Sequence, residues 1–196
     1  MSESNPVSIP SDSNSRLTSQ ASNSNTLDGP YREAVGSLMY LMAMTRPDIC
    51  LAVNQVAQFV QKPEASHWEA VKRIFAYLVK TPNHGICFGK DGGPQLSGYT
   101  DADFAGDVTT RISTTGFVFM LHGGPVSWAS RRQRSIALST TDAEFFAVSE
   151  GAREATWLKR LLEEIGIVVS KVPIRFDSKC AIQLVYNPEN TKELST

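Results

Sequence analysis

Residues 141–165 carry the longest amphipathic pattern of the chain, and they stand between two β-like segments. This order constrains the fold more than any other feature. The helical stripe consists of Val148, Gly151, Ala155, Leu158 and Leu162, and Gly166 ends the pattern. Residues 96–100 before it and 171–176 after it are typical of strands. Because a long helix between two strands is a crossover connection, we expect the second strand to run parallel to a neighbour in the same sheet.

The segment between the first strand and the helix has the pattern of an antiparallel meander. Residues 116–121, 126–128 and 135–138 are short β-like runs joined by glycine-rich turns, and a basic stretch at 131–134 interrupts them. The expected fold class is therefore α/β, with a mixed sheet that combines an antiparallel meander and a parallel crossover strand.

The N-terminal half has a different composition. Residues 1–28 are rich in Ser, Asn, Thr and Pro and carry too little apolar area to offset the entropy of ordering, so we expect a disordered linker. Residues 31–80 show repeated helical periodicity. The sequence thus predicts a linker at 1–28, a helical segment at 29–90 and an α/β domain at 91–196.

The composition excludes several classes of protein. A formal net charge of -1 over 196 residues means that any nucleic-acid binding must come from a local patch. Cys50, Cys87 and Cys180 are odd in number and far apart, which argues against a disulfide framework or a zinc site and favours a reducing intracellular setting, cytoplasmic or nuclear. No apolar run reaches membrane-spanning length, so we expect no membrane partner.

Three acidic residues are placed where a crossover fold gathers ligands. Asp101 ends the first strand, Glu144 lies at the N-terminal tip of the sheet-facing stripe of the helix, and Asp177 ends the last strand. The carboxyl ends of parallel neighbouring strands meet at one edge of a sheet. Three carboxylates without a basic partner repel one another and need divalent cations, for which Mg²⁺ is the usual choice.

Each acid also has a simpler interpretation. Asp101 could be a turn residue, Glu144 could close a capping box with Thr141, and Asp177 could be the N-cap of a final helix at 178–186. Each alternative is the better explanation of its residue taken singly. The coincidence of all three in this topological order favours the metal site.

The same order of elements resembles ribonuclease H, and longer motifs resemble the ribonuclease H domain of copia-type retrotransposon Pol polyproteins. Upstream segments resemble the part that follows the reverse transcriptase core in these polyproteins. The motifs that carry the resemblance are residues 98–107 (GYTDADFAGD), 113–116 (STTG), 123–128 (GGPVSW), 138–145 (LSTTDAEF), 152–158 (AREATWL), 31–40 (YREAVGSLMY), 45–49 (TRPDI) and 67–73 (HWEAVKR).

This resemblance implies two-metal hydrolysis of the RNA strand of an RNA–DNA hybrid, with Mg²⁺ as cofactor and Mn²⁺ as a substitute. It implies that Asp101, Glu144 and Asp177 are the catalytic metal ligands. Asp103 and Ser178 are expected to support these ligands without binding the metal. The basic stretch of Arg131, Arg132 and Arg134 is expected to contact phosphates. The expected partners are an RNA–DNA hybrid and the reverse transcriptase part of the parent polyprotein.

The chain departs from the family pattern in two respects. It lacks the reverse transcriptase catalytic part, so we do not expect a polymerase. The family continues beyond residues 187–188 to a fourth aspartate and a last helix, so we expect a C-terminally incomplete domain with weak activity in Mg²⁺ and better activity in Mn²⁺. The alternative is a catalytically inactive transposon remnant that at most binds nucleic acid or a partner.

Overall fold

The computed structural model of the protein describes residues 7–12, 17–18, 29–89, 95–107 and 109–178. The chain divides into two compact units, Met1–Ile86 and Cys87–Thr196. The sequence predicted the start of the α/β domain a few residues later, at residue 91. Each unit has its own elements and its own buried core.

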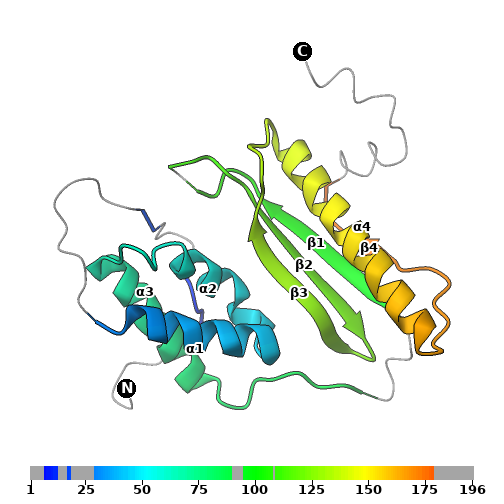
Figure 1. Ribbon diagram of the computed structural model, residues 1–196, viewed down its shortest axis with the longest axis horizontal. Coiled ribbons are helices and arrows are strands. Elements are labelled where there is room, and N and C mark those ends of the chain that lie inside the picture. The colour runs from blue at the N-terminus through cyan, green and yellow to red at the C-terminus, as the bar shows by residue number, and fades with distance from the viewer. Residues whose placement is uncertain (1–6, 13–16, 19–28, 90–94, 108, 179–196) are drawn as a thin grey trace. The chain divides into compact units, whose positions relative to one another are not determined.

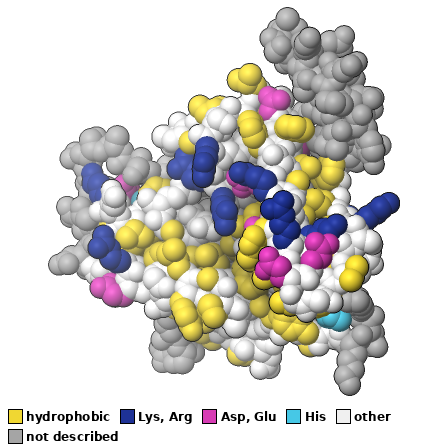
Figure 2. Space-filling model, turned by 45° about the vertical axis from the view of Figure 1, so that its right-hand side comes forward, with side chains coloured by type: hydrophobic (Ala, Val, Ile, Leu, Met, Phe, Trp, Pro, Cys, Tyr) yellow, Lys and Arg dark blue, Asp and Glu magenta, His cyan; other side chains and the backbone are white. Residues whose placement is uncertain are grey.

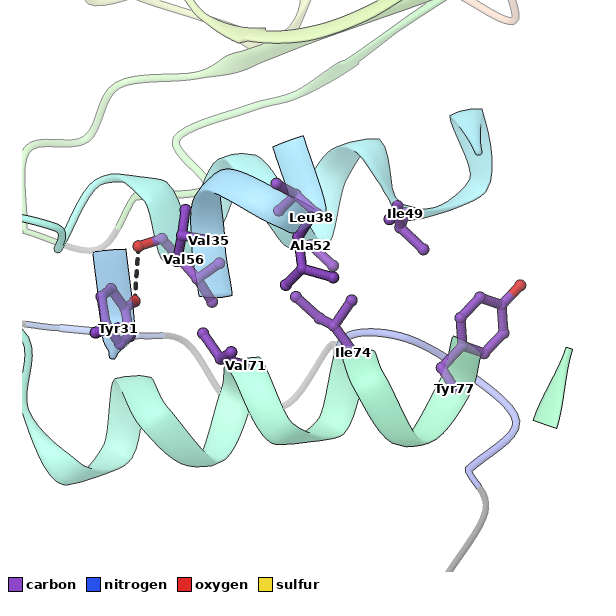
Figure 3. Close-up of a cluster of buried hydrophobic side chains, with 10 residues drawn as sticks. Tyr31, Val35, Leu38, Ile49, Ala52, Val56, Val71, Ile74 and Tyr77 are labelled. Carbon is purple, nitrogen blue, oxygen red and sulfur yellow. Dashed lines mark hydrogen bonds between the residues drawn. The ribbon is translucent and has the colours of Figure 1, made fainter. Parts of the chain in front are cut away.

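The first unit is helical. Its elements are α1 (Tyr31–Met44), the 3₁₀ helix η1 (Pro47–Ile49), α2 (Cys50–Ala57) and α3 (Ala65–Lys80) (Figure 1). Apolar side chains from all four elements form the core shown in Figure 3. The core also contains a buried hydrogen bond, in which the Tyr31 hydroxyl donates to the Val56 carbonyl at 2.8 Å. Burial raises the pKa of the Tyr31 hydroxyl to about 12, so it stays protonated and can serve as the donor.

Part of the predicted linker makes specific contacts with the helical unit. Val7 and Leu17 pack against its core. The Lys80 ammonium donates to the Ser8 hydroxyl at 2.8 Å, and the Thr18 carbonyl lies 3.3 Å from Nε2 of His67. The composition of residues 1–28 gave no sign of these contacts, because they depend on two isolated apolar residues, one serine hydroxyl and one main-chain carbonyl.

The second unit contains a mixed four-stranded sheet with strand order β3-β2-β1-β4. Its strands are β1 (Ser97–Asp103), β2 (Thr114–Leu121), β3 (Gly124–Arg132) and β4 (Ile174–Arg175), and its helix is α4 (Thr140–Glu164). The β1–β2 and β2–β3 pairs are antiparallel, whereas β4 runs parallel to β1. The predicted fold class is therefore confirmed: an α/β fold with a mixed sheet and an N-terminal helical segment, consistent with a ribonuclease H-like arrangement.

Helix α4 lies along the sheet and packs on β1 and β2 (Figure 1). The predicted stripe is the face that it buries, from Val148 to Leu162. Leu158 and Leu162 join Phe117 and Phe119 in the second hydrophobic core. Among the described residues, no helix is both long enough and apolar enough to cross a membrane.

Two details of the β region differ from the sequence prediction. Strand β3 continues through Arg131 and Arg132, where an interruption was expected. Residues 135–138 form no strand, because β2 begins at Thr114, opposite Arg132, and offers no further partner to a strand that continues beyond it. The chain turns there instead and enters α4 through Ser139, whose hydroxyl accepts from the Asp142 amide at 3.1 Å.

The parallel strand is shorter than predicted. Only Ile174 and Arg175 pair with β1, although residues 171–176 had the strand pattern. Apart from Ser178, the final helix predicted at 178–186 lies outside the described residues.

Candidate metal centre

Three carboxylates, from β1, from α4 and from the segment after β4, meet at one end of the sheet. Asp101 belongs to β1, Glu144 is the fifth residue of α4, and Asp177 lies two residues beyond β4. One carboxylate oxygen of each residue lies within 4.8 Å of the other two. The parallel register brings the two aspartates together, since Tyr99 pairs with Arg175 and each aspartate follows its paired residue by two positions.

The structure contradicts the simpler interpretations of Asp101 and Glu144. Asp101 lies inside β1, opposite Gly116, and is not a turn residue. Glu144 does not close a capping box, because the N-cap of α4 is Ser139 and the third helical residue is Asp142. The N-cap interpretation of Asp177 concerns a helix that lies outside the described residues.

The electrostatics of Glu144 indicate a site with excess negative charge. Its Oε2 atom is buried and has no hydrogen-bond partner among the described residues. Burial raises the pKa of Glu144, and the neighbouring charges of Asp101 and Asp177 raise it further, while a hydrogen bond from the Ala102 amide acts in the opposite direction. None of the ion pairs formed within the described part of the chain involves any of the three acids. A bound cation would satisfy both the unpaired oxygen and the repulsion.

The donor set fits a hard divalent cation. All three ligands are carboxylate oxygens, which suit Mg²⁺ and Mn²⁺ better than the soft metals that prefer sulfur or imidazole. Mg²⁺ holds oxygens at about 2.0–2.1 Å, so two ligands on opposite sides of one ion are about 4.2 Å apart. Among three ligands of an octahedral ion at most one pair is opposite, and adjacent oxygens are about 2.9 Å apart. Separations of up to 4.8 Å would therefore have to shorten by movement of the side chains for all three oxygens to bind one ion.

Asp103 and Ser178 do not belong to this group. The Asp103 carboxylate lies against Gly106, where a Cβ atom would overlap its Oδ2 atom, so this acid packs on the turn that follows β1. Ser178 directly follows Asp177 and is half-buried.

The three predicted phosphate-binding arginines are in different environments. The Arg132 guanidinium is held by the Asp107 carboxylate and by the Thr110 hydroxyl, at 2.7 Å in each case. The Arg131 guanidinium lies over the Phe117 ring, 5.9 Å from its centroid, and its residue is exposed. Arg134 is exposed in the turn after β3. These positions make Arg131 and Arg134 the more accessible pair.

Asp107 is a structural residue that the sequence analysis missed. Its Oδ1 atom accepts from the amides of Thr109 and Thr110 at 2.9 and 3.0 Å, while its Oδ2 atom takes the Arg132 bond. Partial burial works to raise the pKa of Asp107, but the hydrogen bonds from Thr110 and Thr109 and the Arg132 charge outweigh it and lower the pKa. An aspartate with threonines two and three positions further along is a turn signal that could have identified this role.

Charges of both signs share the surface of the protein. Figure 2 shows dark-blue Lys and Arg side chains next to magenta Asp and Glu side chains on one face, which agrees with 19 basic and 20 acidic residues in the whole chain. Any attraction for a phosphate backbone must therefore be local.

Comparison with known proteins gives several strong sequence matches. The chain is 45% identical over 193 residues to the retrovirus-related Pol polyprotein from transposon TNT 1-94 of Nicotiana tabacum, and 39% identical over 184 residues to that from transposon RE2 of Arabidopsis thaliana. These matches cover 95% and 93% of the chain, but the chain spans only 14% and 13% of the two polyproteins. No protein-family model and no solved structure matches it.

A shorter relative is covered almost completely. The chain is 50% identical over 129 residues to the secreted RxLR effector protein 161 of Plasmopara viticola, a match that includes 66% of the chain and 91% of that protein. The chain therefore belongs to a family that includes the secreted RxLR effector protein 161 and one segment of the retrovirus-related Pol polyproteins of plant transposons.

Proposed function

We propose that the chain is a retrotransposon-derived ribonuclease H-type endonuclease that hydrolyses the RNA strand of RNA–DNA hybrids with divalent cations. The observation that carries the proposal is the convergence of Asp101, Glu144 and Asp177, with their ligand oxygens within 4.8 Å of one another. The match to transposon Pol polyproteins supports the same conclusion, because copying an RNA element into DNA passes through an RNA–DNA hybrid.

The three acids have distinct parts in this proposal. Asp101 and Asp177 are exposed and can bind cations from the solvent side, whereas Glu144 presents a buried oxygen from the helix. Mg²⁺ or Mn²⁺ held there would polarise a phosphate oxygen and activate water. The resemblance assigns one metal to the attacking water and the other to the leaving 3′ oxygen.

The nucleic-acid contacts are assigned to the basic stretch at the end of β3. Thr115 pairs with Ala102 on one side and with Arg131 on the other, so the arginines belong to the same end of the sheet as Asp101. Arg131 and Arg134 are the proposed phosphate contacts, and Arg132 organises the loop at Asp107. The reverse transcriptase part of a parent polyprotein is the proposed protein partner.

The direct test is cleavage of an end-labelled RNA–DNA hybrid by the full chain in Mg²⁺ and in Mn²⁺. Single-stranded RNA and duplex DNA of the same sequence are the substrate controls. We expect cleavage of the RNA strand of the hybrid, and we expect Asp101→Asn and Glu144→Gln to abolish it. Hybrid binding without carboxylate-dependent cleavage under either metal would overturn the proposal in favour of a binding module.

A further inference from the structure

Gln133 is a buried polar residue at the junction between the sheet and α4. It follows β3 directly and is only 8% exposed. Its Nε2 group donates to the Ala143 carbonyl at 2.9 Å and to the Thr115 hydroxyl at 3.1 Å. Its main-chain amide donates to the Ser113 carbonyl at 2.9 Å. A buried carboxamide is costly without such partners, so its contacts define what it does.

These contacts link the elements that carry two of the three acids. Ala143 immediately precedes Glu144 in α4, and Thr115 pairs with Ala102, the neighbour of Asp101 in β1. The Ser113 hydroxyl also accepts from the Ala105 amide at 3.0 Å, which ties in the turn that follows β1.

The chemistry of the contacts requires an amide nitrogen. The Ala143 carbonyl can only accept, so the group that faces it must donate, and one NH₂ group supplies two donors for two acceptors. A carboxylate at this position has no donor and would place a further negative charge close to Glu144. A methionine of similar length has no donor either, but it fills the same space.

The environment of the Gln133 carboxamide oxygen indicates a role beyond stability. The Gln133 Oε1 atom is buried and has no hydrogen-bond partner among the described residues. An unpaired buried acceptor reduces stability, and an apolar side chain of the same shape would remove that cost, although it would also leave the Thr115 hydroxyl without the Gln133 donor. The donors of Gln133 are therefore explained by what they hold in place.

We propose that Gln133 is a positioning residue: its carboxamide anchors the first turn of α4 to β2 and thereby fixes the Glu144 carboxylate beside Asp101. This inference rests on the proposed function, in which Glu144 is a metal ligand. Gln133 itself touches neither metal nor substrate in this scheme.

The test compares Gln133→Met with Thr115→Val in the full chain. Thr115→Val removes one of the two acceptors but leaves the bond to the Ala143 carbonyl. We expect Gln133→Met to weaken Mn²⁺ binding by about tenfold, the low end of the effect of removing a group that orients a metal ligand. Thr115→Val should retain the wild-type affinity. The dissociation constants come from the electron paramagnetic resonance signal of free Mn²⁺, at a temperature where all variants are folded. Wild-type Mn²⁺ affinity in Gln133→Met would overturn the inference.

A second measurement separates this inference from the proposed function. In metal-free protein, the ¹⁵N order parameter of the Glu144 amide should be near 0.85, the value of rigid backbone, in wild type and in Thr115→Val, and it should fall in Gln133→Met. If wild type binds no Mn²⁺ but the order parameter falls as expected, the proposed function fails and the positioning role stands. If the order parameter is the same in all three proteins, the positioning role fails whatever the metal does.

Discussion

Gly151 of α4 and Thr100 of β1 lie in direct contact. A Cβ atom on Gly151 would overlap the Cγ2 methyl group of Thr100, which is itself buried. Thr100 precedes Asp101 of the candidate metal centre. Gly151 lies on the buried stripe of α4, about two turns of the helix after Glu144. The helix can therefore approach the strand closely enough for Glu144 to reach Asp101 because this position has no side chain.

Gly151→Ala should for that reason destabilise the protein by about 1–3 kcal/mol, the usual cost of overpacking a filled core. Urea denaturation checks the free energy of unfolding. The matched control is Gly36→Ala in α1, where a Cβ atom would have nothing within 4 Å. A helical glycine with open space around it should become more stable as alanine, by about 0.5–1 kcal/mol. Equal effects of the two substitutions would contradict the close packing of α4 on β1.

Asp101→Asn should have opposite effects on metal binding and on metal-free stability. The substitution removes one of the three negative charges that would hold the metal, so Mn²⁺ affinity should fall by at least about tenfold. It also removes a negative charge that raises the pKa of Glu144, so the metal-free protein should melt at a higher temperature than wild type. Calorimetric titration and thermal denaturation measure the two quantities. Glu164→Gln at the exposed far end of α4 is the control, and it should leave Mn²⁺ affinity unchanged. Unchanged metal affinity in Asp101→Asn would count against the site.

The sequence alone was sufficient to predict the crossover and the convergence of the acids. The stripe from Val148 to Leu162 identified the buried face of α4, and the parallel arrangement of β1 and β4 followed from the order of elements. Glu144 lies at the N-terminal tip of this sheet-facing stripe. This position predicted that it would lie near the two strand aspartates, at the same end of the sheet. Periodicity was enough to identify the buried face of the helix, because it is a local property of the sequence. The order of the elements was enough to predict the parallel strand, because few topologies connect a strand, a helix and a strand.

What the sequence did not predict depends on contacts between distant residues. The β-like composition of residues 135–138 suggested a strand, but pairing decides whether a strand forms, and β2 begins only at Thr114, opposite Arg132. The Asp107–Arg132 pair and the contacts of Gln133 join residues that are 10 to 25 positions apart. Nothing in a single sequence distinguishes such a buried glutamine from a solvated one in a basic stretch.

The arginines of the basic stretch should contribute unequally to nucleic-acid binding. Alanine at Arg131 or Arg134 should weaken hybrid binding and reduce the slope of log affinity against log salt by roughly one unit for each phosphate interaction that the substitution removes. Alanine at Arg132 should also lower the melting temperature, since it frees the Asp107 carboxylate in the loop. Fluorescence anisotropy over a salt series measures the slopes. Arg153→Ala on α4, where Arg153 pairs with Glu150, is the control for a general decrease in positive charge. Slopes identical to wild type for Arg131 and Arg134 would show that neither arginine contacts a phosphate.

The stability of the helical unit should fall at mildly acidic pH because of His67. This imidazole is fully buried and stacks on Phe59 with ring centroids 3.8 Å apart. Its Nδ1 atom accepts from the Glu64 amide at 3.0 Å, which caps α3, and its Nε2 atom faces the Thr18 carbonyl. Burial lowers the pKa of His67 below its ordinary value of 6.5, against the smaller opposing effects of the Thr18 carbonyl and the Glu64 charge.

Because the folded state binds the proton less well than the unfolded state, the contribution of His67 is complete above pH 6.5. It is lost as the pH falls from 6.5 through the lower pKa of the folded state. Protonation would also remove the lone pair that accepts the Glu64 amide. His67→Gln keeps an acceptor at this capping position but cannot titrate, so its free energy of unfolding should change less between pH 7.5 and pH 5 than that of wild type. Urea denaturation at a series of pH values measures the difference. If the two proteins lose stability in parallel over this range, His67 is not the titrating group.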